Sequence, residues 1–477
     1  MISQKALFVS WIVLATVLGS LLLRKSRCNK GFKLPPQVPG IPVFGNTFQI
    51  SALQQGPWAK KLVEDQGEIL SGGSTWVFLN SSWVVNNLLE RRAAIYSSRS
   101  PFPMSQGNIS GDSRIIVLML YNERWRMLRK IMHQILNSRQ QDIFKPFKDV
   151  ELKNLCWYYL QTPSRQWSAN ARYANSIIMS VVFGRVNIVD AFPLHEKIPE
   201  VLQWWRPPGE RVFHKTTKVY KFEMPRMKEQ MANGTQRECF GTDSPVKNMT
   251  EVQKLFVFGT LREAGSDTSR VTIGQIIAGA ATYADWVIQA RAQLDEVCRS
   301  NTERLPRWED RERLNYILVV LKEGFRWRPN VAEIGAPAIL IKDDKYEGYH
   351  FPAGIIFTWN AWAIALNPEE YDQMEQFWSD RFLDDNEQNV LKGHWACGPG
   401  RRVCVGWKIG EMNVWIAKAR LLYCFDFEVL PGIPIDTMTI PQITKHSAPF
   451  NIKISPRSAE HAALIRRVSA DVVAGRY

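Results

Sequence analysis

A cysteine near the C-terminus, set in a stretch rich in glycine and arginine, is the residue in this chain best placed to do chemistry. An apolar helical pattern begins directly after Cys404, and a helix N-terminus favours the thiolate form of a cysteine. Gly400 and Gly406 let the backbone approach a flat group closely, and Arg402 offers a bidentate donor for a carboxylate. The alternative is a buried structural cysteine, because most free cysteines are chemically inert.

The elements that must position this stretch are mostly helical in pattern. Helical periodicity indicates helices at 88–94, 122–136, 249–280 and 314–327, and a further helix after Cys404. Runs of β-forming residues between turn signals indicate short strands at 75–79, 338–341, 346–349, 355–358 and 450–454. Because the strands come from both halves of the chain, we expect one interwoven domain that is mainly α with a small β portion.

Composition excludes several classes of protein. In a chain of 477 residues, 45% hydrophobic and 22% charged residues are typical of a globular protein, which excludes wholesale disorder. Seven cysteines are too few for a disulfide-stapled secreted scaffold. The net charge of +14 predicts an acidic partner, and the dispersal of the basic residues argues against a tail that binds nucleic acid.

The N-terminus has the pattern of a single-pass membrane anchor. Residues 6–23 carry no charge, and Arg24, Lys25 and Arg27 follow directly. The positive-inside rule then keeps the rest of the chain in the cytosol. We therefore expect an anchor at 1–24, a basic and proline-rich hinge at 25–45 and a catalytic domain at 46–477. A buried core helix is the alternative for the apolar stretch.

The complete pattern around Cys404 resembles the signature of the cytochrome P450 family, the haem-thiolate monooxygenases. Gly400, Arg402, Cys404 and Gly406 match that signature at its spacing, and the stretch 172–180 is similar to fungal microsomal members of secondary metabolism. The resemblance implies the haem-thiolate fold behind a transmembrane helix. It implies haem b as cofactor, with Cys404 as the axial iron ligand and Arg402 holding a propionate.

Other parts of the chain resemble further motifs of the family, in the right order. Trp125 and Arg129 are similar to its Trp-x-x-x-Arg, which contacts the propionates. Glu323 and Arg326 are similar to its Glu-x-x-Arg, which a downstream arginine, here Arg381, completes. The resemblance implies that these three residues brace the loop that carries the cysteine. Taken alone, the first pair would be an ordinary core-and-surface pair and the second a surface ion pair of little energy.

Residues 264–269 resemble the oxygen-binding stretch in the long central helix of the family. Oxygen activation consumes protons, and a hydroxyl and a carboxylate in a local distortion of the helix can relay them through water. The resemblance therefore gives Asp267 and Thr268 the catalytic role. The alternative is that this polar cluster begins a helix.

The resemblance implies a monooxygenase that activates O₂ to oxidise a small lipophilic substrate. Electrons would come from NADPH through a cytochrome P450 reductase, whose acidic surface would meet a basic face of this chain. We expect the protein in the endoplasmic reticulum membrane with its catalytic domain in the cytosol, and we expect no nucleic-acid partner.

The chain departs from the family pattern at several points. Cys397 takes the place of the usual aromatic residue, and the segments 68–73 and 192–240 look short. These departures motivate the alternative of a haem-binding protein without monooxygenase activity, either a sensor or a decayed enzyme. A haem-thiolate isomerase or dehydratase is a third hypothesis. A zinc protein that uses His394, Cys397 and Cys404 is the fourth.

Overall fold

The structure is a computed structural model that describes most of the chain. The described residues are 33–38, 49, 55–66, 69–72, 76–100, 106, 115–136, 138–177, 211, 214, 217–218, 229, 232–234, 249–299, 302–329, 333–384, 388–437 and 448–474. The predicted membrane anchor at 1–24 lies outside them, as does the first part of the hinge. Among the described helices, none is by itself long and apolar enough to cross a membrane. One bent pair, Asp267–Thr282 with Asp285–Cys298, passes the same test of length and composition.

The chain divides into two compact units, and the first of them, here called the sheet unit, comprises Met1–Ser100 and Ile334–Ala363. Its five-stranded sheet joins strands from both parts of that unit, as we expected. Parallel and antiparallel pairs alternate across the sheet in the order β1-β2-β3-β7-β4. The bounds are β1 Gln37–Val38, β2 Ile69–Gly72, β3 Trp76–Leu79, β7 Ile356–Trp359 and β4 Ala338–Ile339.

Short helical segments of the sheet unit differ from the single helix that we predicted at 88–94. The chain forms a π-helical turn over Asn86–Glu90 and then, after a break at Arg92, an α-helical turn. The break follows from the backbone of Arg92, whose φ of −104° and ψ of 23° are not helical. The helices of this part of the chain are α2 Gln55–Gln66, α3 Ser82–Val85 and α4 Ala93–Tyr96.

The predicted strand at 346–349 is wrong, because these residues form the turn of a hairpin. Strand β5 is Asp344–Tyr346 and pairs antiparallel with β6, Tyr349–Phe351. The two residues between the strands, Glu347 and Gly348, have φ values of 48° and 76°. Two consecutive residues in the left-handed region suit a two-residue hairpin loop, and glycine at the second position adopts this conformation without strain.

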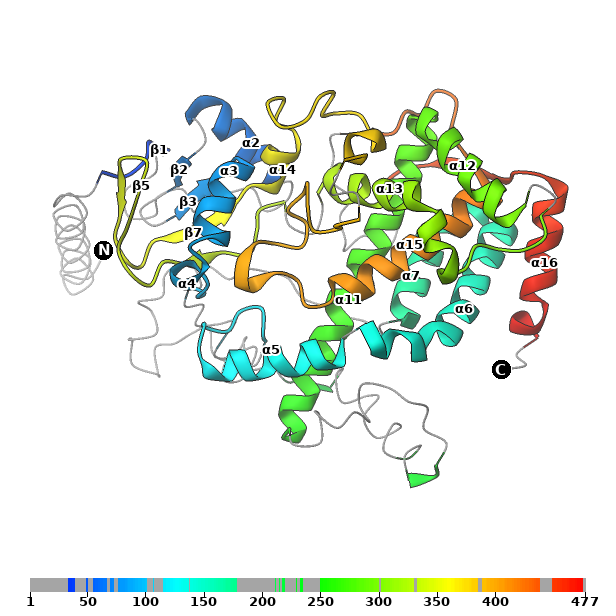
Figure 1. Cartoon of the computed structure of the whole chain (residues 1–477), viewed down its shortest axis with the longest axis horizontal. Helices are drawn as coiled ribbons and strands as arrows, with labels where there is room; N and C mark the ends of the chain where they lie inside the picture. Colours follow the sequence, from blue (N-terminus) through cyan, green and yellow to red (C-terminus); the bar gives the residue numbers. More distant parts are fainter. Residues whose placement is uncertain are drawn as a thin grey trace, which may run out of the picture. The chain divides into compact units, whose positions relative to one another are not determined.

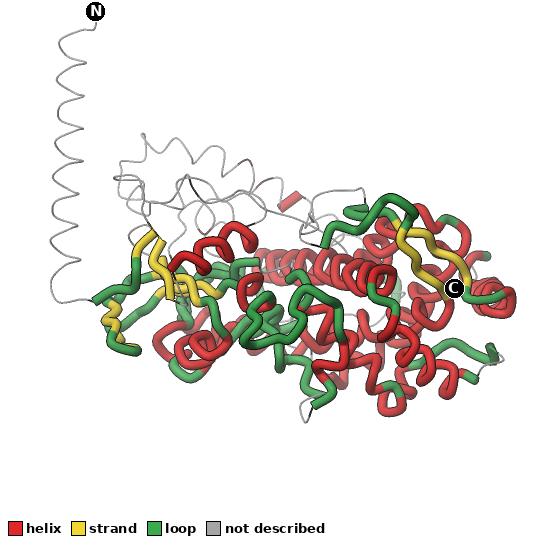
Figure 2. Tube along the Cα trace, turned by 90° about the horizontal axis from the view of Figure 1, so that it is seen from above, coloured by secondary structure: helices red, strands yellow, loops and turns green. Residues whose placement is uncertain are grey.

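The second unit, here called the helical unit, comprises Pro101–Glu333 and Ile364–Tyr477. Helices, red in Figure 2, make up most of it, and its only described sheet is a two-stranded ladder. Figure 1 shows the long helix α11 running among the others. The helices are α5 Glu123–Ile135, α6 Ser138–Gln161, α7 Gln166–Ile177, α11 Glu251–Thr282, α12 Asp285–Cys298, α13 Asn315–Arg326, α15 Trp407–Cys424 and α16 Ala459–Val473, and the strands are β8 Phe425–Val429 and β9 Ile452–Pro456. Helix α14, Ala361–Ala365, joins the two units.

Helix α11 forms the centre of the helical unit, and its sequence explains its start and its packing. Thr250 and Gln253 make a capping box, in which each side chain accepts a hydrogen bond from the other residue's backbone N–H. Helix α13 then crosses α11 closely at Gly324, where an added Cβ would lie 2.6 Å from Ile276 Cγ1. The close crossing places the last turn of α13, with Glu323 and Arg326, deep in the apolar core.

Helix α16 is an element that our sequence analysis missed. Ser458 caps its N-terminus by accepting a hydrogen bond from the His461 backbone N–H at 3.3 Å, and the apolar residues recur at helical spacing along its buried side. The hydroxyl of Ser469 donates to the Lys153 carbonyl of α6 at 3.2 Å, which ties the two helices together. A serine just before a run of helix-forming residues was the signal available in the sequence.

Candidate functional site

The loop that carries Cys404 is a tight turn that ends at the start of α15. The segment Gly400–Arg402 forms a 3₁₀ turn, and Gly406 is the residue that precedes the first turn of α15. The Cys404 backbone N–H donates to the Cys397 carbonyl at 2.8 Å, which closes the loop. Gly400 has a φ of 62°, so the turn requires glycine there. Gly406 has a φ of −94° and needs no such freedom.

Cys404 is exposed to water at the start of α15, yet burial among surrounding protein atoms raises the pKa of its thiol. The Gly406 backbone N–H at the helix start lowers this pKa, as we expected, and the Arg129 guanidinium lowers it as well, but burial has the larger effect. The net pKa shift in the free protein is therefore upward, against the expectation of a thiolate.

Arginines from two distant segments tie the cysteine loop to α5. Arg129 of α5 donates a short hydrogen bond to the Val403 carbonyl, next to Cys404. In the opposite direction, Arg402 donates to the Met119 carbonyl at 2.7 Å. The Arg402 guanidinium also lies 4.2 Å from the centre of the Trp125 ring. The structure thus brings together all the residues that we predicted to hold a cofactor.

These residues fit the haem that the resemblance implies. An exposed thiol is a suitable ligand for iron, and binding to a metal ion deprotonates a thiol whatever its pKa in the free protein. Arg129 and Arg402 place two guanidinium groups at the contact between the cysteine loop and the part of the chain around α5. Guanidinium groups bind carboxylates with two hydrogen bonds, which suits propionates. The donor set therefore matches a thiolate-bound haem.

The two residues predicted to relay protons lie next to each other on α11. The Thr268 hydroxyl donates to the Ala264 carbonyl one turn earlier at 2.7 Å. The Asp267 carboxylate forms an ion pair with Arg270 at 2.7 Å, and the Arg270 guanidinium packs 4.9 Å from the Trp167 ring. We expected a local distortion of the helix here, and α11 runs as one continuous helix through this region, because the hydroxyl supplements the backbone hydrogen bonds instead of replacing them.

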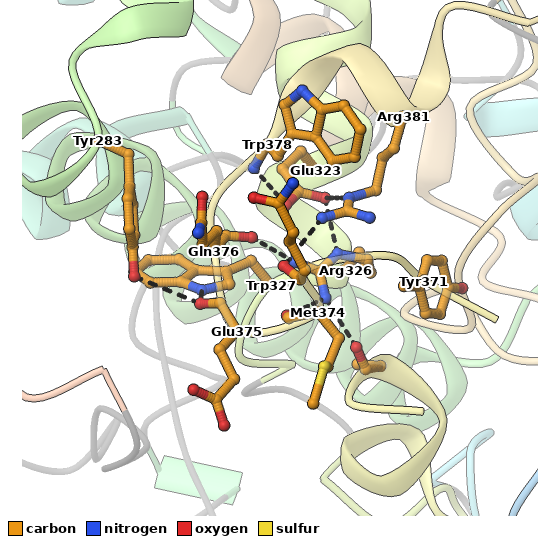
Figure 3. Close-up of polar contacts among 12 residues, drawn as sticks. Tyr283, Glu323, Arg326, Trp327, Tyr371, Met374, Glu375, Gln376, Trp378 and Arg381 are labelled. Atoms are coloured by element: carbon orange, nitrogen blue, oxygen red, sulfur yellow. Dashed lines mark hydrogen bonds and ion pairs between the residues drawn. The ribbon is translucent and has the colours of Figure 1, made fainter. Parts of the chain in front are cut away.

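The predicted trio of Glu323, Arg326 and Arg381 is buried and fully assembled. Figure 3 shows the Glu323 carboxylate between the two guanidinium groups. Arg326 Nε donates to Glu323 Oε2 and Arg326 Nη2 donates to Glu323 Oε1, each at 2.7 Å. Arg381 Nε lies 3.4 Å from Glu323 Oε2. Glu323 is 0% exposed and Arg326 is 1% exposed. This pair is therefore part of the core and not the surface ion pair that the alternative reading gave.

Backbone N–H and carbonyl groups complete the hydrogen bonding of this trio, and sequence reasoning did not find them. The Trp378 N–H donates to Glu323 at 2.9 Å. Arg326 donates to three backbone carbonyls. Arg381 donates to the Asp372 carbonyl at 2.7 Å. The carbonyls that receive the Arg326 bonds belong to Ala365, Met374 and Gln376, at 2.7, 2.8 and 2.9 Å. Loop carbonyls carry no sequence signal, so only the structure could identify them.

His394 has a structural role in the loop that leads to Cys404. Its Nε2 donates to the Val390 carbonyl at 2.7 Å, and its Nδ1 accepts from the Ala396 N–H at 3.3 Å. Both ring nitrogens are used, and burial lowers the pKa of this histidine to about 4. Among the described residues no group of histidine, cysteine and carboxylate side chains is arranged to hold a metal ion. The zinc hypothesis that used His394 is therefore wrong.

Comparisons with known proteins agree with this geometry. The family model "Cytochrome P450" matches residues 177–454. The chain is 30% identical to cytochrome P450 monooxygenase 253 of Postia placenta, over 95% of this chain and 95% of that protein. It is 27% identical to cytochrome P450 monooxygenase virE of Hypocrea virens, over 96% of this chain and 92% of that protein. The resemblance to fungal members is thereby confirmed.

A solved structure shares the fold. A zebra fish cytochrome P450, solved with abiraterone, superposes with a TM-score of 0.62 at 20% identity, and covers 84% of this chain and 100% of that chain. At this identity the likeness concerns the fold alone. The buried Glu323 trio, the accessible Cys404 between two arginines and the family match over more than half of the residues lead to one conclusion. The chain belongs to the cytochrome P450 family and is a P450 monooxygenase.

Proposed function

We propose that this protein is a membrane-anchored monooxygenase that uses a haem bound by Cys404 to oxidise a small lipophilic substrate of fungal secondary metabolism. Its electrons come from NADPH through a cytochrome P450 reductase. The observation that carries the proposal is the exposed Cys404 in a loop that Arg129 and Arg402 tie to α5 and to the segment before it. The fungal P450 monooxygenases that the chain is similar to support the substrate class.

The binding residues have separate tasks. Cys404 supplies the sulfur ligand, and the Gly406 N–H stabilises negative charge on that sulfur. Arg129, Arg402 and Trp125 form the border that receives the carboxylates of the cofactor. When bound, haem supplies the activation of molecular oxygen that no side chain can provide. Glu323 and its two arginines keep the loops behind the site in place, because unpairing a buried charge costs several kcal/mol, roughly 3–5 for one partner.

Proton delivery is the task of Asp267 and Thr268. The Asp267 side chain is 35% exposed, so water can reach its carboxylate while Arg270 holds it in place. The Thr268 hydroxyl donates a hydrogen bond to the Ala264 carbonyl, and its oxygen keeps lone pairs that accept a hydrogen bond from a water molecule. A water between the two side chains can then relay protons from Asp267 toward the bound substrate.

The electron donor docks on a basic surface around the N-terminal half of α5. Arg126, Lys130 and Arg401 are exposed, and Arg126 and Arg401 lie on the same aromatic ring, that of Tyr121. A row of cations at the cysteine loop matches an acidic partner, and such complementarity accelerates association. The net charge of the whole chain, +14, is positive like this surface and also favours an acidic partner.

The first experiment is the carbon-monoxide difference spectrum of the reduced protein in membranes. Wild type should show the strongly red-shifted Soret band of a thiolate-bound haem, and Cys404→Ser should lose it. Cys397→Ser is the matched control, because it changes a neighbouring thiol in the same loop and should keep the band. A band that survives in Cys404→Ser and disappears in Cys397→Ser would assign the ligand to the wrong cysteine and overturn the proposal.

A second experiment separates a monooxygenase from a haem protein without this activity. Purified protein with reductase and NADPH should consume oxygen when lipophilic candidate substrates are added, and a product should gain an oxygen atom from ¹⁸O₂. A red-shifted Soret band without any such product would favour the sensor or decayed enzyme, for which Cys397 in place of an aromatic residue is the motivation.

A third experiment tests the anchor and the location in the endoplasmic reticulum membrane. Deletion of residues 1–24 should move much of the protein from the carbonate-resistant membrane pellet to the supernatant. Full-length protein should co-fractionate with endoplasmic reticulum markers. Full-length protein that carbonate extracts from the membrane would contradict the transmembrane anchor.

A further inference from the structure

Two arginines of the cysteine loop and two aromatic rings at the start of α5 form a closed cluster, defined as Arg401, Arg402, Tyr121 and Trp125. The Tyr121 hydroxyl accepts a hydrogen bond from Arg401 Nη1 at 2.7 Å, and the Arg401 guanidinium lies 5.4 Å from the centre of the Tyr121 ring. The Tyr121 and Trp125 rings lie 5.2 Å apart with a tilt of 48°. Trp125 in turn packs against Arg402 at 4.2 Å. Because Arg401 and Arg402 are consecutive, the cluster closes on itself.

The cluster offsets the repulsion between neighbouring positive charges in the cysteine loop. Two consecutive guanidinium groups repel each other, and a third cation, Arg126, lies 5.6 Å from the Tyr121 ring. The tyrosine accepts a hydrogen bond from Arg401 and also presents its ring to it, so that Arg401 is held away from Arg402. The Trp125 ring, which is buried between Tyr121 and Arg402, then has a fixed position against Arg402.

We propose that Tyr121 and Arg401 are positioning residues for cofactor binding, which act by fixing Trp125 and Arg402 beside the cysteine loop. This inference rests on the proposed function, because Trp125 and Arg402 are the residues proposed to receive the carboxylates of haem. Tyr121 lies immediately before the residue that caps α5, Asn122, and Arg401 lies in the cysteine loop. The pair therefore couples the start of α5 to the cysteine loop, in addition to the bond between Arg129 and Val403.

The test measures the rate at which haem leaves the purified full-length protein for an excess of apomyoglobin. Tyr121→Phe removes only the hydroxyl and should accelerate haem transfer about threefold, the usual effect of one hydrogen bond. Tyr121→Leu also removes the ring, and Arg401→Gln removes the cation. Each should accelerate transfer about tenfold and should move part of the carbon-monoxide Soret band to the ordinary haem position.

The double variant Tyr121→Leu with Arg401→Gln should release haem no faster than the worse single variant, because both act through one cluster. Tyr158→Leu is the matched control. Its ring also packs on an arginine, Arg172 at 4.9 Å, but belongs to α6, and haem transfer should stay at the wild-type rate. The midpoint of thermal unfolding of the haem-free variants should stay at the wild-type value, which a merely structural role would not allow.

Two results would overturn the proposal. One is a transfer rate within twofold of wild type for Tyr121→Phe, Tyr121→Leu and Arg401→Gln alike. The other is additive acceleration in the double variant, which would mean that Tyr121 and Arg401 act separately. Failure of the proposed function gives a different result, because wild-type protein would then lack the red-shifted band before any variant is compared. Tyr121→Phe keeps the ring and the packing, so it remains informative if the leucine variant does not fold.

Discussion

Lys418 is a lysine in the middle of α15 that is almost completely buried. It is 1% exposed, and its Nζ has no hydrogen-bond partner among the described residues. Burial lowers the pKa of Lys418 well below its ordinary value, and the nearby Glu411 carboxylate opposes this shift. Glu411 itself makes a short ion pair with Arg311, so it keeps a partner without the lysine. The lysine is therefore a cost to stability that this fold carries.

We predict that Lys418→Met stabilises the protein at neutral pH by about 1–4 kcal/mol, as replacement of a buried charged residue by an apolar one of similar size often does. Because the pKa of Lys418 is lower in the folded chain than in the unfolded chain, the cost of its charge is absent above pH 10.5 and grows as the pH falls from 10.5 toward the lower pKa of the folded chain. Thermal unfolding of both proteins at pH 7 and pH 9.5 measures this. A gain that is equal at both pH values would contradict it.

His394 makes the stability of the folded protein depend on pH in the acidic range. Because its pKa is about 4 in the folded protein, the neutral imidazole contributes stability that is complete above the unfolded pKa of about 6.5 and is lost as the pH falls through 4. At pH 5 the loss should be about 2 kcal/mol. His394→Gln keeps a donor and an acceptor without the titration, so its stability should change less between pH 7.5 and pH 5. Denaturant unfolding at these two pH values compares the proteins, and equal losses in both would exclude His394 as the cause.

At the scale of residues, spacing predicted which side chains meet, and burial decided their energetics. The three-residue spacing of Glu323 and Arg326 was enough to pair them, because it places both on one helix face. The same reasoning could not tell that the pair is buried, because burial depends on the crossing with α11. Tyr121 and Arg401 were not found, because nothing in the sequence relates residues so far apart.

Helices α11 and α13 approach each other so closely at Gly324 that no larger residue fits without movement. An added Cβ would lie 2.6 and 2.8 Å from two carbon atoms of Ile276. Glycine lowers the intrinsic stability of helix α13 slightly, and it allows close packing where the two helices cross.

We predict that Gly324→Ala destabilises the protein by about 1–3 kcal/mol through overpacking, although alanine is the better helix former. The double variant Gly324→Ala with Ile276→Ala provides the control, because it removes the atoms that the new methyl group would meet. Relative to Ile276→Ala alone, the added methyl group should cost little or should stabilise. A cost of Gly324→Ala that is the same in both backgrounds, measured by thermal unfolding, would show that the crossing is not its cause.

At the scale of elements, three long helices were predicted with nearly correct bounds, whereas the long helix α16 and the short, irregular segments were missed. The predictions at 122–136, 249–280 and 314–327 agree with α5, α11 and α13 within two residues at each end. The strand predicted at 346–349 failed because Glu347 takes a left-handed conformation that its residue type does not favour. The π-helical turn at Asn86–Glu90 has no sequence pattern of its own.

At the scale of the whole molecule, we expect the excess of positive charge to attract the acidic surface of the partner that delivers electrons. Exposed cations occur on several elements, so the net charge alone does not say where an acidic protein docks. The basic surface around α5 is the proposed place because it adjoins the loop that carries Cys404. Arg466, an exposed cation on α16, offers a comparison at a different element.

We predict that Lys130→Glu lowers the apparent affinity for the reductase by about three- to tenfold at low salt, and that the difference from wild type shrinks at high ionic strength, where charges are screened. Arg466→Glu makes the same change in net charge on α16 and should leave the reductase kinetics unchanged. Reduction rates in stopped-flow experiments at two salt concentrations measure both variants. Equal losses in both would mean that only net charge matters and not the surface around α5.

Of the organisation of the whole chain, the sequence predicted the fold class through its resemblance to a known family. Physical pattern alone gave a mostly helical body with strands from both halves, which the sheet order β1-β2-β3-β7-β4 confirms. The division into two compact units was not predictable, because it depends on which strands pair across the chain. The borders 1–24, 25–45 and 46–477 stay predictions.

The bond between Arg129 and the Val403 carbonyl has a consequence for the biosynthesis of the protein. It joins residues that are 274 positions apart in the chain. At synthesis rates of about 5–20 residues per second, the second partner emerges about 14–55 s after the first. Until then the cofactor site lacks both Cys404 and the loop carbonyl that Arg129 binds, so the site can be completed only late in the synthesis of the chain.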